Sequence, residues 1–106
     1  MKNRPIYISG QITSTDPVIQ KLNIVRFFEV EKELKSRGLP IFNPARTEFE
    51  NPDMTEYNQF MALDLIYIIE KKPSMYMLKG WKFSKGALLE HEVAVQLNLP
   101  IEYEPL

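Results

Sequence analysis

The chain has 106 residues, of which 44% are hydrophobic and 25% are charged, as expected for one ordinary globular domain spanning 1–106. A net charge of −1 without any run of Lys or Arg argues against binding a nucleic-acid polymer, because that affinity depends on many phosphate contacts. The absence of cysteine and the single histidine exclude thiolate and multi-histidine metal centres. We therefore expect neither a metal nor an organic cofactor.

The N-terminal segment is polar, and the apolar run that follows it is only a few residues long. Such a run is too short for a signal peptide or a membrane span. The sequence therefore predicts a cytoplasmic protein that does not contact a membrane.

The first part of the chain predicts a strand followed by a helix. Residues 6–8 are apolar and β-prone, and Ser9-Gly10 ends this strand. After a polar loop over 11–16, the spacing of apolar residues predicts a helix over 18–37, which Gly38 ends. The expected buried stripe of this helix consists of Leu22, Val25, Phe28, Val30 and Leu34.

The remaining chain repeats this alternation. Residues 39–42 form a predicted strand that Asn43-Pro44 stops, and a polar loop then runs to about Met54. Further elements are a predicted helix over 55–70, a strand over 75–78, a helix over 84–98 and a last strand over 100–103.

Alternating strands and helices predict an α/β fold, with a parallel sheet covered by helices on both faces. In such folds a ligand binds beyond the carboxyl ends of the strands, near a topological switch point. Those ends carry glycine and polar residues here, namely Ser9-Gly10-Gln11, Asn43-Pro44-Ala45 and Lys79-Gly80-Trp81. Neither a dinucleotide-binding GxGxxG nor a P-loop motif is present.

Glu90 is the most unusual residue of the sequence. Residues three and four apart share a helix face, and the face of Glu90 is otherwise small or apolar: Gly86, Leu89, Val93, Ala94 and Leu97. Such a stripe faces the core, where an ionised carboxylate costs free energy unless it is paired or hydrogen-bonded. Glu90 is therefore a candidate catalytic group. The alternative is a partly buried glutamate that a neighbouring Tyr or Lys satisfies.

Asp64 repeats this pattern more weakly in the predicted helix over 55–70. It is the acid in a stripe that otherwise contains Tyr57, Phe60, Met61, Leu65 and Ile68. Two acids on facing helices suit glycosidic chemistry, in which one carboxylate attacks and another group assists the leaving group. The alternative is an aspartate that caps or pairs locally.

Four other residues have a functional and a structural interpretation. The hydroxyl of Tyr7 either reaches a substrate or Glu90, or belongs to a core tyrosine. Trp81 stacks on a base or covers the core. Ser84 is the expected N-cap, and the free amides there form an anion site or belong to a capped helix with no ligand. Arg46 either brings positive charge near the cleft or is solvated at the surface.

Four segments, in this order, resemble the nucleoside 2-deoxyribosyltransferase-like superfamily, and most closely the small DUF4406 proteins of bacteria and phages. The matching segments are Tyr7-Ile8-Ser9-Gly10-Gln11-Ile12-Thr13, Phe42-Asn43-Pro44-Ala45, 57–64, and 80–90 together with Ala94. Two positions depart from the family pattern. Gln11 stands where a proline usually follows the first-strand glycine, and Pro73 stands where an acid often precedes the third strand.

This resemblance implies a three-layer, flavodoxin-like (doubly wound) sheet, assembled as a homodimer or higher homo-oligomer with the site near a subunit interface. It implies a nucleophile at Glu90, four residues after Gly86, an acid that contacts the nucleobase at Asp64, and an aromatic residue near the sugar at Tyr7. Ser84, six residues before the glutamate, resembles the branch of 2′-deoxynucleoside 5′-phosphate N-hydrolases, in which a serine there binds the 5′-phosphate.

Together these features predict a small N-glycosidase or deoxyribosyltransferase-like enzyme acting on a (deoxy)nucleoside 5′-monophosphate or a nucleoside. The expected catalytic residues are Glu90, Asp64 and Tyr7. The expected substrate-binding residues are Ser9, Gly10, Asn43, Trp81, Ser84 and Gly86. The main alternative is a non-catalytic nucleotide-binding or sensor module of the same fold. A third possibility is an interaction protein in which Glu90 only satisfies a dimer contact.

Overall fold

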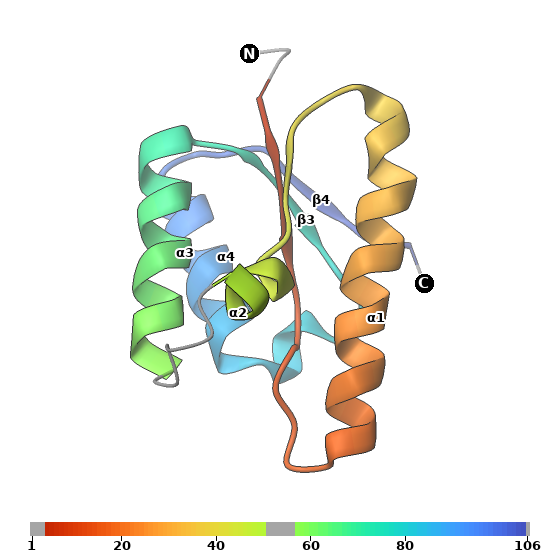
Figure 1. Cartoon of the computed structure of the whole chain (residues 1–106). Coiled ribbons are helices and arrows are strands. Elements are labelled where there is room, and N and C mark those ends of the chain that lie inside the picture. The colour runs from red at the N-terminus through yellow and green to blue at the C-terminus, as the bar shows by residue number, and fades with distance from the viewer. Residues whose placement is uncertain (1–3, 51–56, 106) are drawn as a thin grey trace.

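Strands alternate with helices along the chain, as the sequence predicts (Figure 1). The computed structural model describes residues 4–50 and 57–105. In chain order the elements are β1 (Ile6–Ser9), α1 (Pro17–Leu34), a 3₁₀ turn η1 (Lys35–Arg37), β2 (Ile41–Phe42), α2 (Ala45–Glu50), α3 (Tyr57–Lys71), β3 (Ser74–Met77), a 3₁₀ turn η2 (Trp81–Phe83), α4 (Lys85–Gln96) and β4 (Ile101–Tyr103).

The strands form one sheet in the order β2-β1-β3-β4, and each neighbouring pair is parallel. Ile8 of β1 pairs with Tyr76 of β3, which in turn pairs with Glu102 of β4. The chain runs outward from β1 to β2 and then crosses back to β3, so the strand order reverses between β1 and β3. This topology confirms the predicted doubly wound, flavodoxin-like parallel sheet.

The two faces of the sheet have separate hydrophobic cores, because successive residues of a strand point to opposite sides. Ile6 and Ile8 belong to the core under α1, together with Phe27, Val30, Leu34 and Tyr76. Tyr7 belongs to the core under α3 and α4, together with Ile68, Met75, Met77, Ala87 and Ala94. In Figure 1, α1 lies on one side of the strands and α3 and α4 lie on the other. The predicted three layers are therefore present.

The buried side of α1 differs from the predicted stripe. Asp16 caps the helix by accepting a hydrogen bond from a backbone amide of the first turn, and the chain leaves η1 through Gly38 with a φ of +72°. Leu22 and Val25, which were expected to be buried, are 62% and 45% exposed. The first turns of α1 extend beyond the end of β1 (Figure 1), so none of the described strands lies under them. Val30 and Leu34 are buried as predicted, and the other buried residues of α1 are Phe27 and Glu31.

Residues 45–50, which were predicted to lie in a loop, form α2. The side-chain oxygen of Asn43 accepts a hydrogen bond from the amide of Ala45 at 2.9 Å, a contact that starts helices. Asn43-Pro44 was interpreted as the end of a strand, but the same pair also begins a helix. The rest of the predicted loop, and residues 55–56 of the next predicted helix, lie outside the described residues.

Candidate active site

Glu90 lies on the inner face of α4. Glu90 is only 5% exposed, and Gly86 and Ala94, each four positions away on the same face, are buried as well. The buried face is narrower than the predicted stripe, since Leu89 and Leu97 are exposed. The carboxyl group nevertheless points inward, toward the sheet.

Both carboxylate oxygens of Glu90 accept hydrogen bonds from β1. The Tyr7 hydroxyl donates to Oε2 at 2.7 Å, and the Ser9 hydroxyl donates to Oε1 at 2.7 Å. Tyr7 and Ser9 are two positions apart, so they project from the same face of the strand. A carboxylate oxygen accepts more than one hydrogen bond. Both oxygens of Glu90 therefore retain the capacity to interact with a ligand.

The surroundings of Glu90 favour its neutral form. Burial raises its pKa from 4.5 to about 7, although the hydrogen bonds from Ser9 and Tyr7 oppose this rise because they stabilise the carboxylate. The neutral and ionised forms are therefore both populated near neutral pH. A buried acid with this property is a candidate functional group when it borders a cavity.

Glu90 does border a cavity, of about 190 Å³, at the carboxyl end of β1. Asp64 of α3, which is 7% exposed, lines the same cavity, so the structure brings the two predicted acids together. No basic side chain is found among the described residues that line it. The other walls come from the loop after β1, from Pro44 after β2, and from Tyr57, Phe60 and Met61 of α3. This is where the switch-point rule places a ligand.

Tyr7 lies between the two acids. Burial raises the pKa of its phenol well above the ordinary value, and the charges and hydrogen bonds of Glu90 and Asp64 act in the same direction. The ring stacks on Phe42 with ring centroids 5.2 Å apart, and Phe42 stacks on Tyr67 at 4.1 Å. Tyr7 is therefore a neutral phenol whose ring is held in place by packing.

Two glycines that line the cavity let neighbouring segments pack closely. A Cβ on Gly86 would lie 3.0 Å from the Tyr57 hydroxyl oxygen and 3.1 Å from Sδ of Met61, so Gly86 lets α3 pack closely against α4. A Cβ on Gly10 would lie 3.0 Å from Cβ of Leu78. Both glycines line the cavity, as do several other residues of the segments that carry the family resemblance.

Trp81 lies away from this cavity. It stacks on His91, with ring centroids 4.3 Å apart, and lies beside Tyr103 in a separate hollow of about 570 Å³. The His91 Nε2 and the Tyr103 hydroxyl are 2.7 Å apart. Trp81 is thus placed against α4 and β4 rather than beside Glu90.

Ser84 lies outside the inner cavity but close to it. It is the N-cap of α4, as predicted, and its Oγ accepts a hydrogen bond from the amide of Ala87 at 3.2 Å. It also lines an outer hollow of about 410 Å³ with Lys85. Thr13 and Tyr57 line both this hollow and the cavity of Glu90, so the two spaces adjoin.

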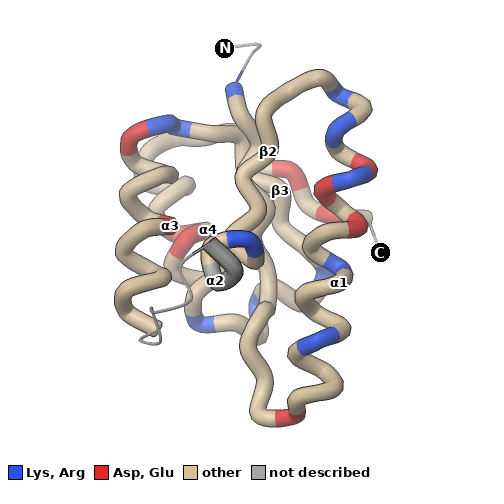
Figure 2. The backbone as a smooth tube through the Cα atoms, in the orientation of Figure 1, with Lys and Arg blue, Asp and Glu red and all other residues tan. Residues whose placement is uncertain are grey.

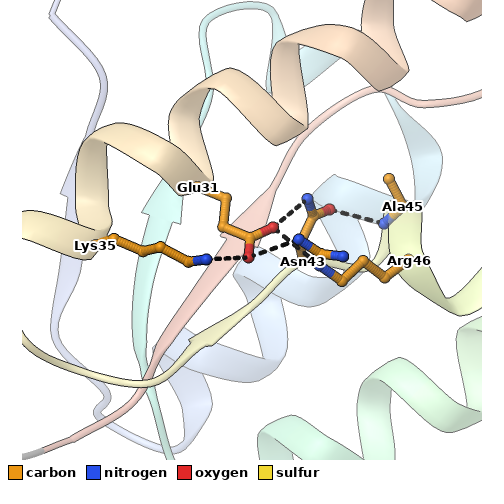
Figure 3. Close-up of polar contacts among 5 residues, drawn as sticks. All are labelled: Glu31, Lys35, Asn43, Ala45 and Arg46. Atoms are coloured by element: carbon orange, nitrogen blue, oxygen red, sulfur yellow. Dashed lines mark hydrogen bonds and ion pairs between the residues drawn. The ribbon is translucent and has the colours of Figure 1, made fainter.

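Asn43 belongs to a polar cluster between α1 and the start of α2 (Figure 3). Its amide nitrogen donates to Oε1 of Glu31 at 3.0 Å, while its oxygen caps α2. Arg46 donates to both carboxylate oxygens of Glu31, at 3.1 and 3.0 Å. The ammonium of Lys35 lies 3.9 Å from Oε2 of Glu31. Both ends of the Asn43 amide therefore make protein contacts, and Pro44, its neighbour, lines the cavity.

Sequence reasoning missed Glu31, although the signal that identified Glu90 is present. Glu31 is 6% exposed and lies on the buried face of α1. Burial alone would raise its pKa, but the hydrogen bonds from Arg46 and Asn43 and the nearby positive charges outweigh burial and lower the pKa. Arg46 was expected either near the cleft or solvated at the surface. Its side chain is 47% exposed, as the second interpretation expects, and it also pairs with Glu31, with its guanidinium 4.8 Å from the centre of the Phe28 ring.

The remaining charged residues that the structure describes lie on several elements. Figure 2 shows Lys and Arg distributed over several elements. Within residues 4–50 and 57–105, no three His, Asp or Glu side chains gather in a way that could hold a metal ion. In the same part of the chain, no helix combines the length and the apolar character that crossing a bilayer requires.

Comparison with known proteins identifies the family alone. No curated protein and no solved structure matches this sequence. The model of one family, described as a domain of unknown function (DUF4406), matches residues 4–103. This match extends from before β1 to the end of β4 and includes Tyr7, Asp64 and Glu90. The chain therefore belongs to the DUF4406 family.

Proposed function

We propose that this protein is an N-glycosidase related to the nucleoside 2-deoxyribosyltransferase-like superfamily, and that it cleaves the N-glycosidic bond of a (deoxy)nucleoside 5′-monophosphate. The observation that carries the proposal is the pair of buried acids beside one cavity. Glu90 accepts hydrogen bonds from two hydroxyl groups, and Asp64 lines the same space. Two carboxyl groups beside one small cavity are the machinery that glycosidic cleavage uses.

In the first step, an oxygen of ionised Glu90 attacks C1′ of the sugar. The bond from C1′ to the base breaks, and the departing base takes a proton from Asp64, giving a glycosyl ester of Glu90. In the second step, water attacks C1′, the ester C–O bond breaks, and the water proton returns to Asp64. The products are the free base and a sugar phosphate. Two inversions leave the configuration at C1′ retained.

The contacts of Tyr7 support these roles. A phenol has one proton to donate, and the proton of Tyr7 is directed to Glu90. Tyr7 also interacts with Asp64 by a hydrogen bond that raises the pKa of the phenol. Because the hydrogen bond from Tyr7 stabilises the carboxylate form of Glu90, we assign Glu90 the role of nucleophile and Asp64 the role of acid. Tyr7 then connects the two carboxyl groups and stabilises Glu90 in its ionised form.

The experiment is a test of base release. Purified protein is incubated with a panel of nucleosides and nucleoside monophosphates, and free base is measured by chromatography. We expect release from at least one monophosphate, and a loss of more than about 10³-fold in Glu90→Ala. Glu92→Ala is the matched control, since Glu92 lies on the exposed side of the same helix.

A second readout on the same panel is binding, measured by calorimetry. Release by the wild type that persists in Glu90→Ala would contradict the proposed nucleophile. Binding without release from any substrate would replace the enzyme with a nucleotide-binding module of the same fold. If the protein neither binds nor cleaves any compound of the panel, nucleotide recognition at this cavity would be refuted.

A further inference from the structure

Tyr57, at the start of α3, stands where two spaces meet. It lines the cavity of about 190 Å³ that contains Glu90, and it also lines the outer hollow of about 410 Å³ that contains Ser84 and Lys85. Thr13, in the loop after β1, lines both spaces as well. A ligand that extends from one space into the other therefore lies against Tyr57 and Thr13.

The hydroxyl of Tyr57 is directed inward although the residue is 50% exposed. Its oxygen lies 3.0 Å from the position that a Cβ of residue 86 would occupy, so the absence of a side chain at Gly86 makes room for it. Burial raises the pKa of Tyr57, and the negative charges of Glu90 and Asp64 raise it further. The hydroxyl therefore keeps its proton and lies close to both acids.

The two spaces differ in charge. Asp64 and Glu90 line the inner cavity, and its described lining includes no basic residue, whereas Lys85 lines the outer hollow with no acid among the described residues there. The inner cavity is also smaller than the ~300–1,000 Å³ typical of sites for whole small molecules. A ligand thus fits with an uncharged part inside and an anionic part outside.

We propose that Tyr57 is a specificity-determining residue, whose hydroxyl donates a hydrogen bond to the ligand where it passes from the inner cavity to the outer hollow. The ligand class is a glycoside that carries an anionic group and is too long to fit within the inner cavity alone. The identity of the inner part as a glycoside rests on the proposed function. The inference that the ligand contacts Tyr57 on its way between the two spaces rests only on the placement of Tyr57, Thr13 and Gly86.

The test measures the affinity of a nucleoside monophosphate by calorimetry in a Glu90→Gln background, where the proposed chemistry does not consume it. Tyr57→Phe removes only the hydroxyl, and we expect affinity to fall roughly three- to tenfold. The matched control is Tyr67→Phe. Tyr67 is on the same helix but stacks on Phe42 instead of lining the cavity, and we expect no change in affinity there.

A second variant examines the packing over Gly86. Gly86→Ala places a methyl group against the Tyr57 oxygen and against Sδ of Met61. Both atoms must shift, so we expect binding of the monophosphate to weaken. Circular dichroism and a melting curve of each variant establish that it is folded.

Equal affinities of the Tyr57→Phe and Tyr67→Phe proteins would overturn the inference, whatever the wild type does to the substrate. Binding that depends on Tyr57, in a protein that releases no base, would uphold the inference and refute the proposed hydrolysis. Base release by a protein whose affinity does not change in Tyr57→Phe would uphold the proposed hydrolysis and refute the inference. No binding of any nucleoside monophosphate would refute both.

Discussion

Tyr7 and Glu90 are 83 positions apart in the chain, yet the phenol of Tyr7 donates a hydrogen bond to Oε2 of Glu90 at 2.7 Å. This contact joins β1 to α4 and also affects the charge of the acid. Burial drives Glu90 toward its neutral form, and the hydroxyls of Tyr7 and Ser9 oppose that drive. The same two hydrogen bonds therefore serve the packing of the fold and the availability of a carboxylate.

The first prediction concerns stability as a function of pH. Because the pKa of Glu90 is about 7 in the folded protein and close to 4.5 in the unfolded chain, the folded state binds the proton more tightly. The contribution of Glu90 is thus most favourable below pH 4.5 and is lost as the pH rises through about 7. The loss amounts to about 3 kcal/mol.

Glu90→Gln cannot ionise, so it lacks this pH dependence. We expect the free energy of unfolding of the wild type, relative to Glu90→Gln, to fall by about 3 kcal/mol between pH 4.5 and pH 8. Urea titrations of both proteins across this range measure it. A difference that stays constant, or one that grows with pH, would contradict a raised pKa at Glu90.

The second prediction concerns the rate of base release. If ionised Glu90 is the nucleophile, kcat/KM rises about tenfold per pH unit below pH 6 and levels off above the pKa of about 7. Initial rates measured between pH 5 and pH 9 in buffers of constant ionic strength give this profile. A rate that increases toward low pH instead would assign Glu90 the role of an acid.

The third prediction tests the hydrogen bond from Tyr7. Tyr7→Phe keeps the ring that stacks on Phe42 but removes a donor that stabilises the carboxylate, so the pKa of Glu90 rises further. The acid limb of the pH–rate profile should then shift to higher pH. Tyr76→Phe is the matched control, because Tyr76 is also buried but packs on the opposite face of the sheet. A shift of equal size in both variants would show that the effect does not come from the contact with Glu90.

Much of the arrangement around Glu90 could be predicted, because it follows from two local periodicities. The helical repeat places Gly86, Glu90 and Ala94 on one face, and the strand repeat places Tyr7 and Ser9 on one face. The alternation of strands and helices then predicts a parallel sheet, which brings those faces together. What periodicity does not give is which hydroxyl reaches which oxygen, since that depends on the register of α4 over β1.

The parts that were mispredicted depend on three-dimensional context. Leu22 and Val25 have the spacing of a buried stripe, but the first turns of α1 extend past the sheet and leave them exposed. The interpretation of Asn43 as the end of a strand and the beginning of a loop neglected its ability to cap α2. For Trp81 the sequence left two interpretations open, because periodicity does not fix which ring it stacks on; in the structure it stacks on His91 and lies beside Tyr103.

The last prediction concerns Glu31, which connects α1 to the segment that carries Pro44 into the cavity wall. Glu31→Gln retains the shape of the side chain and removes the charge that Arg46 contacts, so the two hydrogen bonds from the guanidinium weaken. Since Arg46 is itself 47% exposed and can be rehydrated, we expect the free energy of unfolding to fall by only about 2 kcal/mol at pH 7.

The pKa of Glu31 is lowered in the folded protein, so its stabilising contribution is present above pH 4.5 and is lost as the pH falls. The difference between Glu31→Gln and the wild type should therefore shrink in acid. Glu33→Gln, an exposed acid on the same helix, should change stability by less than about 0.5 kcal/mol, and an equally large effect there would mean that the charge of α1 matters and not the Glu31 cluster.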